Sequence, residues 1–278
     1  FELRGGQVVI TVTLQGRYVP ALLDTGATRT LIEEGLAREL GIRNGRSHNS
    51  GTIGASGKRV DLGYTSHVTL DIGFGAVTSR IATYPAGNTF TDDGVRLLIG
   101  MDFLRDLAVS IDFQTMTVDF QRSSTFRAPK GEALKMTPSG WRERPTVPVS
   151  LSGERADMLL DTAASGSLHL DSSFVAATPA LKALPVTRRR IAGIDGVREH
   201  DAILVPQVTL GGQVFENVRA SSLPFGRRSF TDGLDGVVGV DLLKRFNLVI
   251  DFSGRRIWMT PHGASAASTA AGKEPCGF

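Results

Sequence analysis

Two motifs in the first half of this sequence return in the second half, in the same order. The segment 21–28, Ala-Leu-Leu-Asp-Thr-Gly-Ala-Thr, returns 137 residues later at 158–165 as Met-Leu-Leu-Asp-Thr-Ala-Ala-Ser. The segment 98–102, Leu-Ile-Gly-Met-Asp, returns 139 residues later at 237–241 as Val-Val-Gly-Val-Asp. Two similar halves predict two related lobes about an approximate twofold axis. The two Asp-Thr motifs are expected to meet at that axis.

The length and composition suit two lobes with separate cores. The chain has 278 residues, of which 41% are hydrophobic, enough for two domains of roughly 100–150 residues each. Its 32 glycines and 7% aromatic residues favour strands and turns over helical bundles. We expect an N-terminal lobe over residues 1–120, an interlobe linker over 121–145, a C-terminal lobe over 146–260 and a disordered tail over 261–278.

Apolar periodicity predicts strands with a few short helices. Alternation predicts strands at Val8–Leu14 and Tyr18–Leu23, joined by a tight turn. Helical spacing over Thr30–Leu40 predicts a helix that ends at Gly41. Further strands of the first half are predicted at Val68–Ile72, Thr78–Thr83, Leu97–Ile99, Val109–Phe113 and Thr117–Phe120. The second half is expected to repeat this order.

Each Asp-Thr motif places one carboxylate at the end of an apolar strand. Two leucines precede Asp24, and two precede Asp161, so both carboxylates are expected at a dry boundary. Two carboxylates side by side cannot both ionise cheaply, so such a pair shares one proton. One carboxylate can then take a proton from water while the other donates to a carbonyl oxygen. A lone Asp-Thr-Gly is an ordinary turn, but two copies, each followed 76 or 78 residues later by apolar-apolar-Gly, favour this chemistry.

The pattern Leu-Leu-Asp-Thr-Gly-Ala with a later Leu-Ile-Gly resembles the retropepsin-like aspartic proteases, and their bacterial two-lobed, single-chain members most closely. The resemblance covers Val8–Thr260. It implies an all-β fold with minor helices, made of two pseudo-twofold-related β-barrel lobes with a cleft between them. It implies that Asp24 and Asp161 are the catalytic pair, and that Thr25 and Thr162 brace each other beneath it.

The same resemblance implies an aspartic endopeptidase. The expected partner is a polypeptide substrate, and neither a cofactor nor a metal is needed. Because both lobes belong to one chain, a monomer is expected.

Glycine-rich hairpin tips in both halves match the flaps that close over a peptide in this family. The tip residues are Ile53, Gly54, Ala55, Ser56 and Gly57 in the first half, and Gly193, Ile194, Asp195 and Gly196 in the second. Neither tip carries the tyrosine of the single pepsin flap. The chain therefore resembles a fused retropepsin dimer.

One position departs from the family pattern. The second motif has Ala163 where the first has Gly26. If this position needs a glycine-like backbone, Ala163 shifts the Asp161 carboxylate or costs about 1 kcal/mol. Two alternatives to a protease therefore stay open. One is a peptide-binding protein with an impaired second loop, and the other is an acid–base enzyme that does not cleave peptides.

The other acidic residues and the histidines receive structural interpretations. Asp102 and Asp241 follow the apolar-Gly motifs and are predicted to cap short helices. Asp112 and Asp251 lie in matching Ile-Asp-Phe contexts and are predicted to be turn residues at strand ends. None of the five histidines has metal-ligand spacing, so no metal site is expected.

Charge and hydropathy argue against nucleic acid or a membrane span. The formal charge is only +3, and the run Arg188–Arg190 is predicted to lie in a solvated loop. No apolar run approaches the ~18 residues that a spanning helix needs. Cys276 is the only cysteine, so no intrachain disulfide is expected. The chain begins at Phe1, so either a leader or anchor has been removed or the chain was cut there, and a periplasmic or secreted location is favoured.

Overall fold

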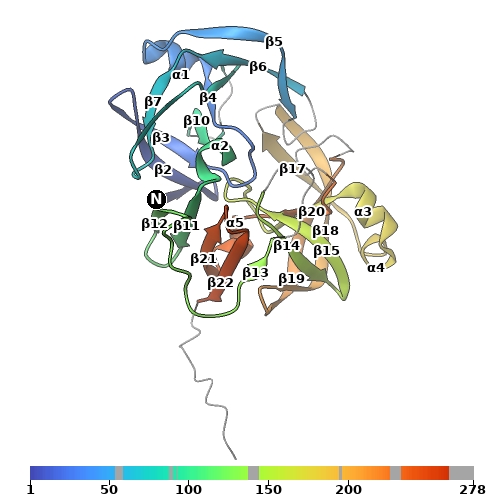
Figure 1. Cartoon of the computed structure of the whole chain (residues 1–278). Coiled ribbons are helices and arrows are strands. Elements are labelled where there is room, and N and C mark those ends of the chain that lie inside the picture. The colour runs from blue at the N-terminus through green and yellow to red at the C-terminus, as the bar shows by residue number, and fades with distance from the viewer. Residues whose placement is uncertain are drawn as a thin grey trace, which may run out of the picture.

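A computed structural model of the chain describes residues 1–53, 59–87, 90–91, 93–136, 144–193, 196–225 and 233–262. Most of these residues lie in strands, and the helices are short. The strands form an N-terminal lobe, a C-terminal lobe and a sheet that joins the two (Figure 1). The all-β fold with minor helices is therefore confirmed.

The N-terminal lobe is a ten-stranded sheet with the order β5-β6-β9-β4-β10-β3-β2-β7-β8, and β1 pairs with β2. Its strands are β1 (Glu2–Arg4), β2 (Gln7–Leu14), β3 (Arg17–Leu23), β4 (Leu31–Glu33), β5 (Asn44–Ile53), β6 (Arg59–Thr65), β7 (Val68–Asp71), β8 (Ala76–Ser79), β9 (Ala82–Tyr84) and β10 (Leu97–Ile99), with helix α1 (Glu34–Glu39) after β4. The predicted β2–β3 hairpin is present. Its turn uses Gln15 at φ 50° and Gly16 at φ 76°, the left-handed backbone that such tight turns require.

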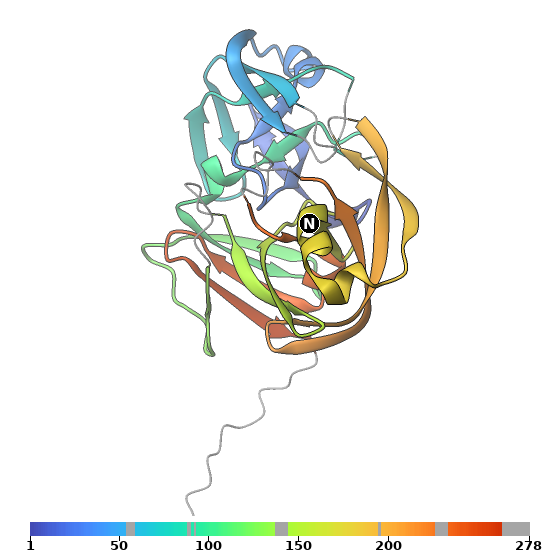
Figure 2. The ribbon, with the colours of Figure 1, turned by 90° about the vertical axis from the view of Figure 1, so that its right-hand side faces the viewer.

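The C-terminal lobe is a closed barrel. Its elements are β14 (Thr146–Leu151), β15 (Glu154–Leu160), β16 (Leu168–Asp171), α3 (Ser172–Ala177), α4 (Pro179–Lys182), β17 (Thr187–Gly193), β18 (Gly196–Leu210), β19 (Gln213–Leu223) and β20 (Gly236–Val238). The strand order is β14-β15-β20-β16-β19-β18, and β18 pairs back onto β14, so six strands close on themselves. Strand β17 extends this sheet beyond β18 (Figure 2).

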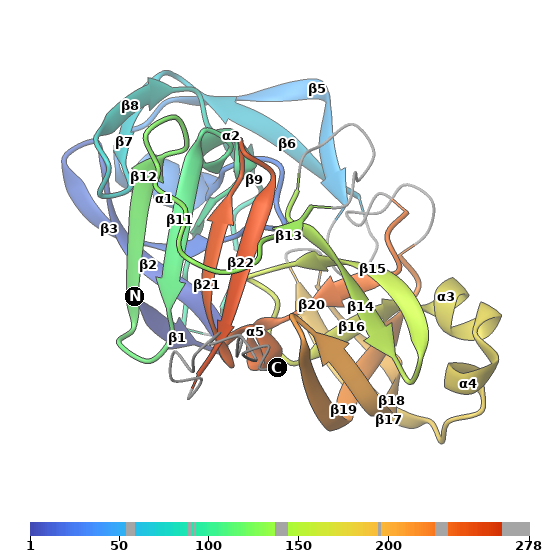
Figure 3. The same cartoon turned by 60° about the horizontal axis from the view of Figure 1, so that its bottom comes forward.

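A five-stranded sheet with the order β12-β11-β21-β22-β13 joins the two lobes (Figure 3). Its strands are β11 (Leu107–Asp112), β12 (Thr117–Arg122), β13 (Leu134–Lys135), β21 (Phe246–Asp251) and β22 (Arg256–Pro261), and helices α2 (Met101–Leu104) and α5 (Val240–Leu243) precede β11 and β21. Strands β11 and β21 pair antiparallel across the pseudo-twofold, from Ala108 with Asp251 to Asp112 with Asn247. This pairing fixes the lobes relative to each other.

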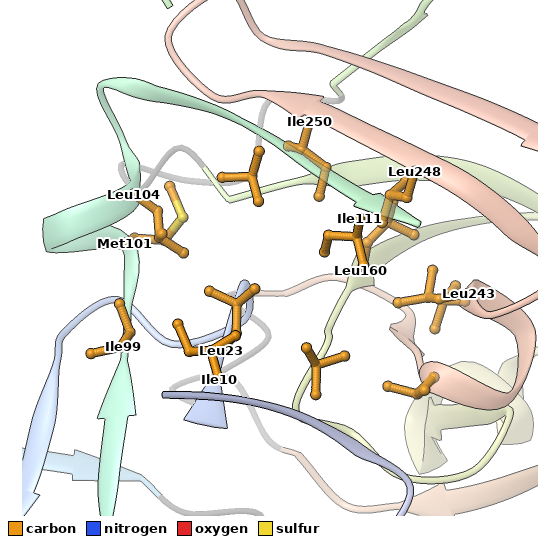
Figure 4. Close-up of a cluster of buried hydrophobic side chains, with 14 of the residues drawn as sticks. Ile10, Leu23, Ile99, Met101, Leu104, Ile111, Leu160, Leu243, Leu248 and Ile250 are labelled. Atoms are coloured by element: carbon orange, nitrogen blue, oxygen red, sulfur yellow. The ribbon is translucent and has the colours of Figure 1, made fainter. Parts of the chain in front are cut away.

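The joining sheet shares one apolar core with both lobes (Figure 4). Ile10, Leu23 and Ile99 come from the first half, and Leu160 and Leu248 come from the second. Each of these five side chains is at most 5% exposed. Apolar burial of this extent is the main stabilising contribution to the fold.

Two secondary-structure predictions were wrong. The predicted helix over Thr30–Leu40 begins as strand β4 and becomes helical only at Glu34. Its three apolar-rich residues pair with β10 and β9, so sheet pairing overrides the helical spacing. The end of the helix is as predicted, because Gly41 adopts φ +69°. The predicted strand Thr78–Thr83 is two strands, β8 paired with β7 and β9 paired with β4 and β6.

The segment predicted as a linker contains ordered structure. Strand β12 continues to Arg122, and Leu134 pairs with Ile257 of β22. Arg144, next to the second lobe, is only 2% exposed. Of the predicted tail, Pro261 and His262 are described and the rest lies outside the described residues. Among the described helices, none combines the length and the apolar character needed to cross a bilayer.

Candidate active site

The two Asp-Thr loops follow equivalent strands. Strand β3 leads to Asp24 and pairs in parallel with β10, while β15 leads to Asp161 and pairs in parallel with β20. The main-chain N–H of Asp24 donates to Ile99 O, and that of Asp161 donates to Val238 O, each at 3.0 Å. Both aspartates are 8% exposed. The repeated apolar-Gly motif therefore anchors each catalytic-type loop to the core.

Backbone N–H groups hold each carboxylate in place. Asp24 Oδ1 accepts hydrogen bonds from the N–H of Gly26 at 2.8 Å and of Ala27 at 2.7 Å. Asp161 Oδ1 accepts from the N–H of Ala163 at 2.7 Å. Both carboxylates are thus fixed by their own loops, in the manner of an Asx turn.

The two threonines bind the loops together across the lobes. The N–H of Thr25 donates to Thr162 Oγ1, and the N–H of Thr162 donates to Thr25 Oγ1, both at 3.2 Å. Thr25 Oγ1 donates to Leu160 O at 2.7 Å, and Thr162 Oγ1 donates to Leu23 O. Both threonines are fully buried. The loops therefore form one reciprocal hydrogen-bonded unit at the pseudo-twofold.

The carboxyl groups of Asp24 and Asp161 interact directly, and their environments differ. Burial and the neighbouring Asp161 charge raise the pKa of Asp24 well above its ordinary value, against the opposing effect of two backbone N–H groups. Burial also raises the pKa of Asp161, but the Ala163 N–H, the hydrogen bond with Asp24 and the Arg144 charge all oppose this rise. The arrangement favours a shared proton on Asp24 and the negative charge on Asp161.

Gln7 and Arg144 form an equivalent pair that the sequence interpretation did not identify. Gln7 Nε2 donates to Ala163 O at 2.6 Å, and Arg144 Nη1 donates to Gly26 O at 3.3 Å. Each residue precedes the aspartate of its own half by 17 positions and contacts the loop of the other half. The repeat offset could have revealed this pair. Only Arg144 brings a positive charge.

The position of Ala163 causes no backbone strain. Neither Ala163 nor Gly26 has a positive φ. The predicted cost of alanine in a glycine-like conformation is therefore wrong for this loop. The Ala163 N–H makes the same bond to its carboxylate as that of Gly26.

The arms of both predicted flaps are paired hairpins. Ile53 pairs with Arg59 at the end of β5–β6, and Gly193 pairs with Gly196 at the end of β17–β18. The remaining predicted tip residues, Gly54, Ala55, Ser56, Gly57, Ile194 and Asp195, lie outside the described residues.

The helix-cap predictions for two other aspartates were wrong. Helix α2 begins after Gly100 and α5 after Gly239, with no side-chain cap at either. Asp102 instead accepts from the N–H and Oγ1 of Thr30, at 2.8 and 2.7 Å, and so braces the first loop. Asp241 pairs with Lys244 Nζ at 2.6 Å.

The turn prediction for the other acidic pair is confirmed. Asp112 accepts from the N–H of Gln114, and Asp251 accepts from the N–H of Gly254. Within the described part of the chain, no three His, Cys, Asp or Glu side chains form a group that could hold a metal ion.

Comparison with known proteins gives a separate match for each half. Residues 10–106 match the gag-polyprotein putative aspartyl protease family, and residues 147–242 match the aspartyl protease family. Among solved structures, the EIAV protease complexed with the inhibitor HBY-793 is similar at 23% identity. That alignment covers 36% of this chain and 86% of the other, with a TM-score of 0.28. No curated protein matches the chain.

Proposed function

Because the chain contains two retropepsin-like aspartyl protease domains, we propose that it is a single-chain aspartic endopeptidase with Asp24 and Asp161 as its catalytic pair. The observation that carries the proposal is the direct interaction of these two buried carboxyl groups, which raises the pKa of Asp24. A carboxylate and a carboxylic acid side by side provide a general base and a general acid in one site.

The proposed reaction uses both protonation states at once. Asp161, as the carboxylate, takes a proton from a water molecule that attacks the peptide carbonyl carbon. Asp24, as the acid, donates its proton to the carbonyl oxygen, and a tetrahedral diol forms. Proton transfer to the amide nitrogen then allows the C–N bond to break. Thr25 and Thr162 keep the two carboxyl groups aligned through this exchange.

The proposed substrate is an extended polypeptide between the lobes. Hairpins β5–β6 and β17–β18 supply the flaps in this proposal, and peptide recognition by strand-like pairing suits them. Their glycine-containing tips would give the backbone freedom that closure needs.

The test is single-atom replacement in the pair. Asp24→Asn and Asp161→Asn are each expected to lower peptide turnover by about 10²–10⁴-fold, because an amide cannot serve as acid or base here. Asp119→Asn is the control, since Asp119 is exposed on β12. Cleavage of a random peptide library, read by mass spectrometry, gives the measurement.

Near-normal turnover in Asp161→Asn would contradict the two-carboxylate mechanism. Tight peptide binding by the wild-type protein without cleavage would favour the peptide-binding alternative. Turnover of a different substrate that depends on both aspartates would favour the non-proteolytic enzyme.

A further inference from the structure

Five polar or basic side chains of the C-terminal lobe share one face of its sheet. Strand register places His169 of β16 opposite Ser221 of β19, and Ser221 opposite Ala202 of β18. The same register places Arg219 opposite Leu204, two residues further along β18. His200 lies two residues before Ala202 and pairs with Arg189 of β17. Because strand side chains alternate between faces, His169, Ser221, Arg219, His200 and Arg189 all lie on one face.

These residues line a cavity of about 320 Å³ next to the second Asp loop. Ser165 and Gly166, which follow Asp161 by four and five positions, form part of its wall. Gln7 also lines the cavity and donates to Ala163 O within that loop. Arg189 lies on the arm of hairpin β17–β18, gold in Figure 2. The cavity therefore lies between a proposed flap and the proposed catalytic loop.

The equivalent face of the N-terminal lobe is apolar. There, Leu31 takes the place of His169, because it pairs with Leu98 as His169 pairs with Val237. Ala82 corresponds to Ser221 in the same way, since it pairs with Leu31.

Leu62 completes the N-terminal set, at the position of His200 two residues before the partner of Ala82. Leu31, Ala82 and Leu62 are 6%, 3% and 2% exposed and pack in one apolar cluster. The polar cavity is therefore a property of one lobe only.

The arginines of the cavity are not neutralised within the described part of the chain. Arg189 and Arg219 have no ion-pair or hydrogen-bond partner among the described residues. Their neighbour Arg188, on the opposite face of β17, pairs with Asp201 at 3.2 Å. The one acidic residue in the lining, Asp241, is paired with Lys244. The cavity therefore carries uncompensated positive charge. The run Arg188–Arg190 was predicted to lie in a solvated loop, but it lies in strand β17.

We infer that this cavity binds an acidic side chain of the polypeptide substrate, on one side of the cleaved bond only. The inference rests on the proposed function and adds a substrate class to it. Guanidinium groups bind carboxylates through charge-assisted, often bidentate, hydrogen bonds. The hydroxyl of Ser221 and the imidazoles of His169 and His200 provide further polar groups around the bound carboxylate.

The first test compares peptides that differ by one charge. Library cleavage is expected to show Asp or Glu enriched at one position on one side of the cleaved bond. At that position, a Glu peptide is expected to have a kcat/KM at least about tenfold above that of its Gln twin. Arg189→Gln and Arg219→Gln should each lower this Glu/Gln ratio. Arg188→Gln removes the same charge from the opposite face of β17 and should preserve the ratio.

Cleavage of Glu and Gln twins at equal rates would overturn the inference. So would equal loss of the ratio in Arg188→Gln and Arg189→Gln, because that result would indicate a long-range charge effect.

A binding measurement separates this inference from the proposed function. Immobilised Asp24→Asn protein is incubated with random octapeptide pools that carry either one Glu or one Gln, and the retained peptides are counted. Selective retention of Glu peptides, lost on adding Arg189→Gln, would support the cavity even if the wild-type protein cleaved nothing. Equal retention of both pools would overturn the cavity, whatever the outcome of the cleavage assay.

Discussion

Gly26 lies against the carboxylate of Asp161, so closely that a Cβ at position 26 would be 2.6 Å from Asp161 Oδ2 and 2.8 Å from its Cγ. The two Asp loops are therefore not interchangeable at this position. In the second loop, Ala163 carries a methyl group that packs against the apolar cluster of the N-terminal lobe. The first loop needs glycine for space, since its φ is not positive.

This relationship predicts opposite outcomes for two matched substitutions. Gly26→Ala should displace the Asp161 carboxylate and lower turnover by about tenfold or more, because a shift of ~1 Å in a catalytic group is costly. Ala163→Gly should keep most of the activity, with a loss of about 1 kcal/mol in the free energy of unfolding. Steady-state turnover of both variants on one peptide, with urea unfolding alongside, provides the measurement.

Similar turnover in wild-type protein and Gly26→Ala would mean that the Asp161 side chain moves aside without loss. A severe loss in Ala163→Gly would mean that the methyl group of Ala163 contributes to alignment of the second loop.

Arg144 should set the acidic limb of the pH profile. Its charge opposes the rise in the pKa of Asp161, so its removal should raise that pKa. The acidic limb of kcat/KM, which reports ionisation of the free enzyme, should then move to higher pH by about one unit in Arg144→Gln. Arg144→Lys should keep the limb in place because it retains the charge.

Gln7→Ala is the matched control for Arg144→Gln. It removes the equivalent hydrogen bond to the other loop without a change in charge. If Gln7→Ala and Arg144→Gln shift the acidic limb equally, the effect comes from loop geometry and the electrostatic role of Arg144 is wrong.

The raised pKa of Asp24 should make the pair a source of instability at neutral pH. A carboxyl whose pKa is higher in the folded than in the unfolded protein stabilises the fold fully below its ordinary value of 3.8. This contribution is lost as the pH rises through the folded-state pKa. Asp24→Asn cannot ionise, so its Tm should exceed that of the wild type, by an amount that grows from about pH 4 to about pH 7.

Thermal unfolding of both proteins across this range checks the prediction, with Asp119→Asn as the exposed control. A Tm difference between Asp24→Asn and wild type that stays constant with pH would contradict it.

The repeat made the site predictable, because each half carries its own copy of the motif. Alternation was enough to predict the β2–β3 hairpin and its lead into Asp24. The pairing of β11 with β21 was not predictable, since it joins segments about 140 residues apart and neither strand indicates its partner. Arg144 was missed because its role depends on the opposite lobe.

The cationic cavity was missed for a related reason. Its charge is spread over four strands, and only their register brings the residues to one face. From the sequence, Arg188–Arg190 is a run of like charges. In the sheet, alternation separates Arg188, which is ion-paired, from Arg189, which lines the cavity.

The last prediction concerns the hydroxyl group of Thr162. It accepts from the Thr25 N–H and donates to Leu23 O, so it satisfies two buried groups of the opposite loop. Thr162→Val keeps the shape but leaves both groups unpaired, and should lower the free energy of unfolding by about 2–5 kcal/mol. Thr162→Ser keeps the hydroxyl and should lose only about 1 kcal/mol for the missing methyl. Turnover should fall far more in the valine variant, because the loops that hold Asp24 and Asp161 are no longer tied together. Urea unfolding and peptide turnover measure both effects, and equal losses in the two variants would mean that packing of the methyl group, rather than the reciprocal hydrogen bonds, aligns the two loops.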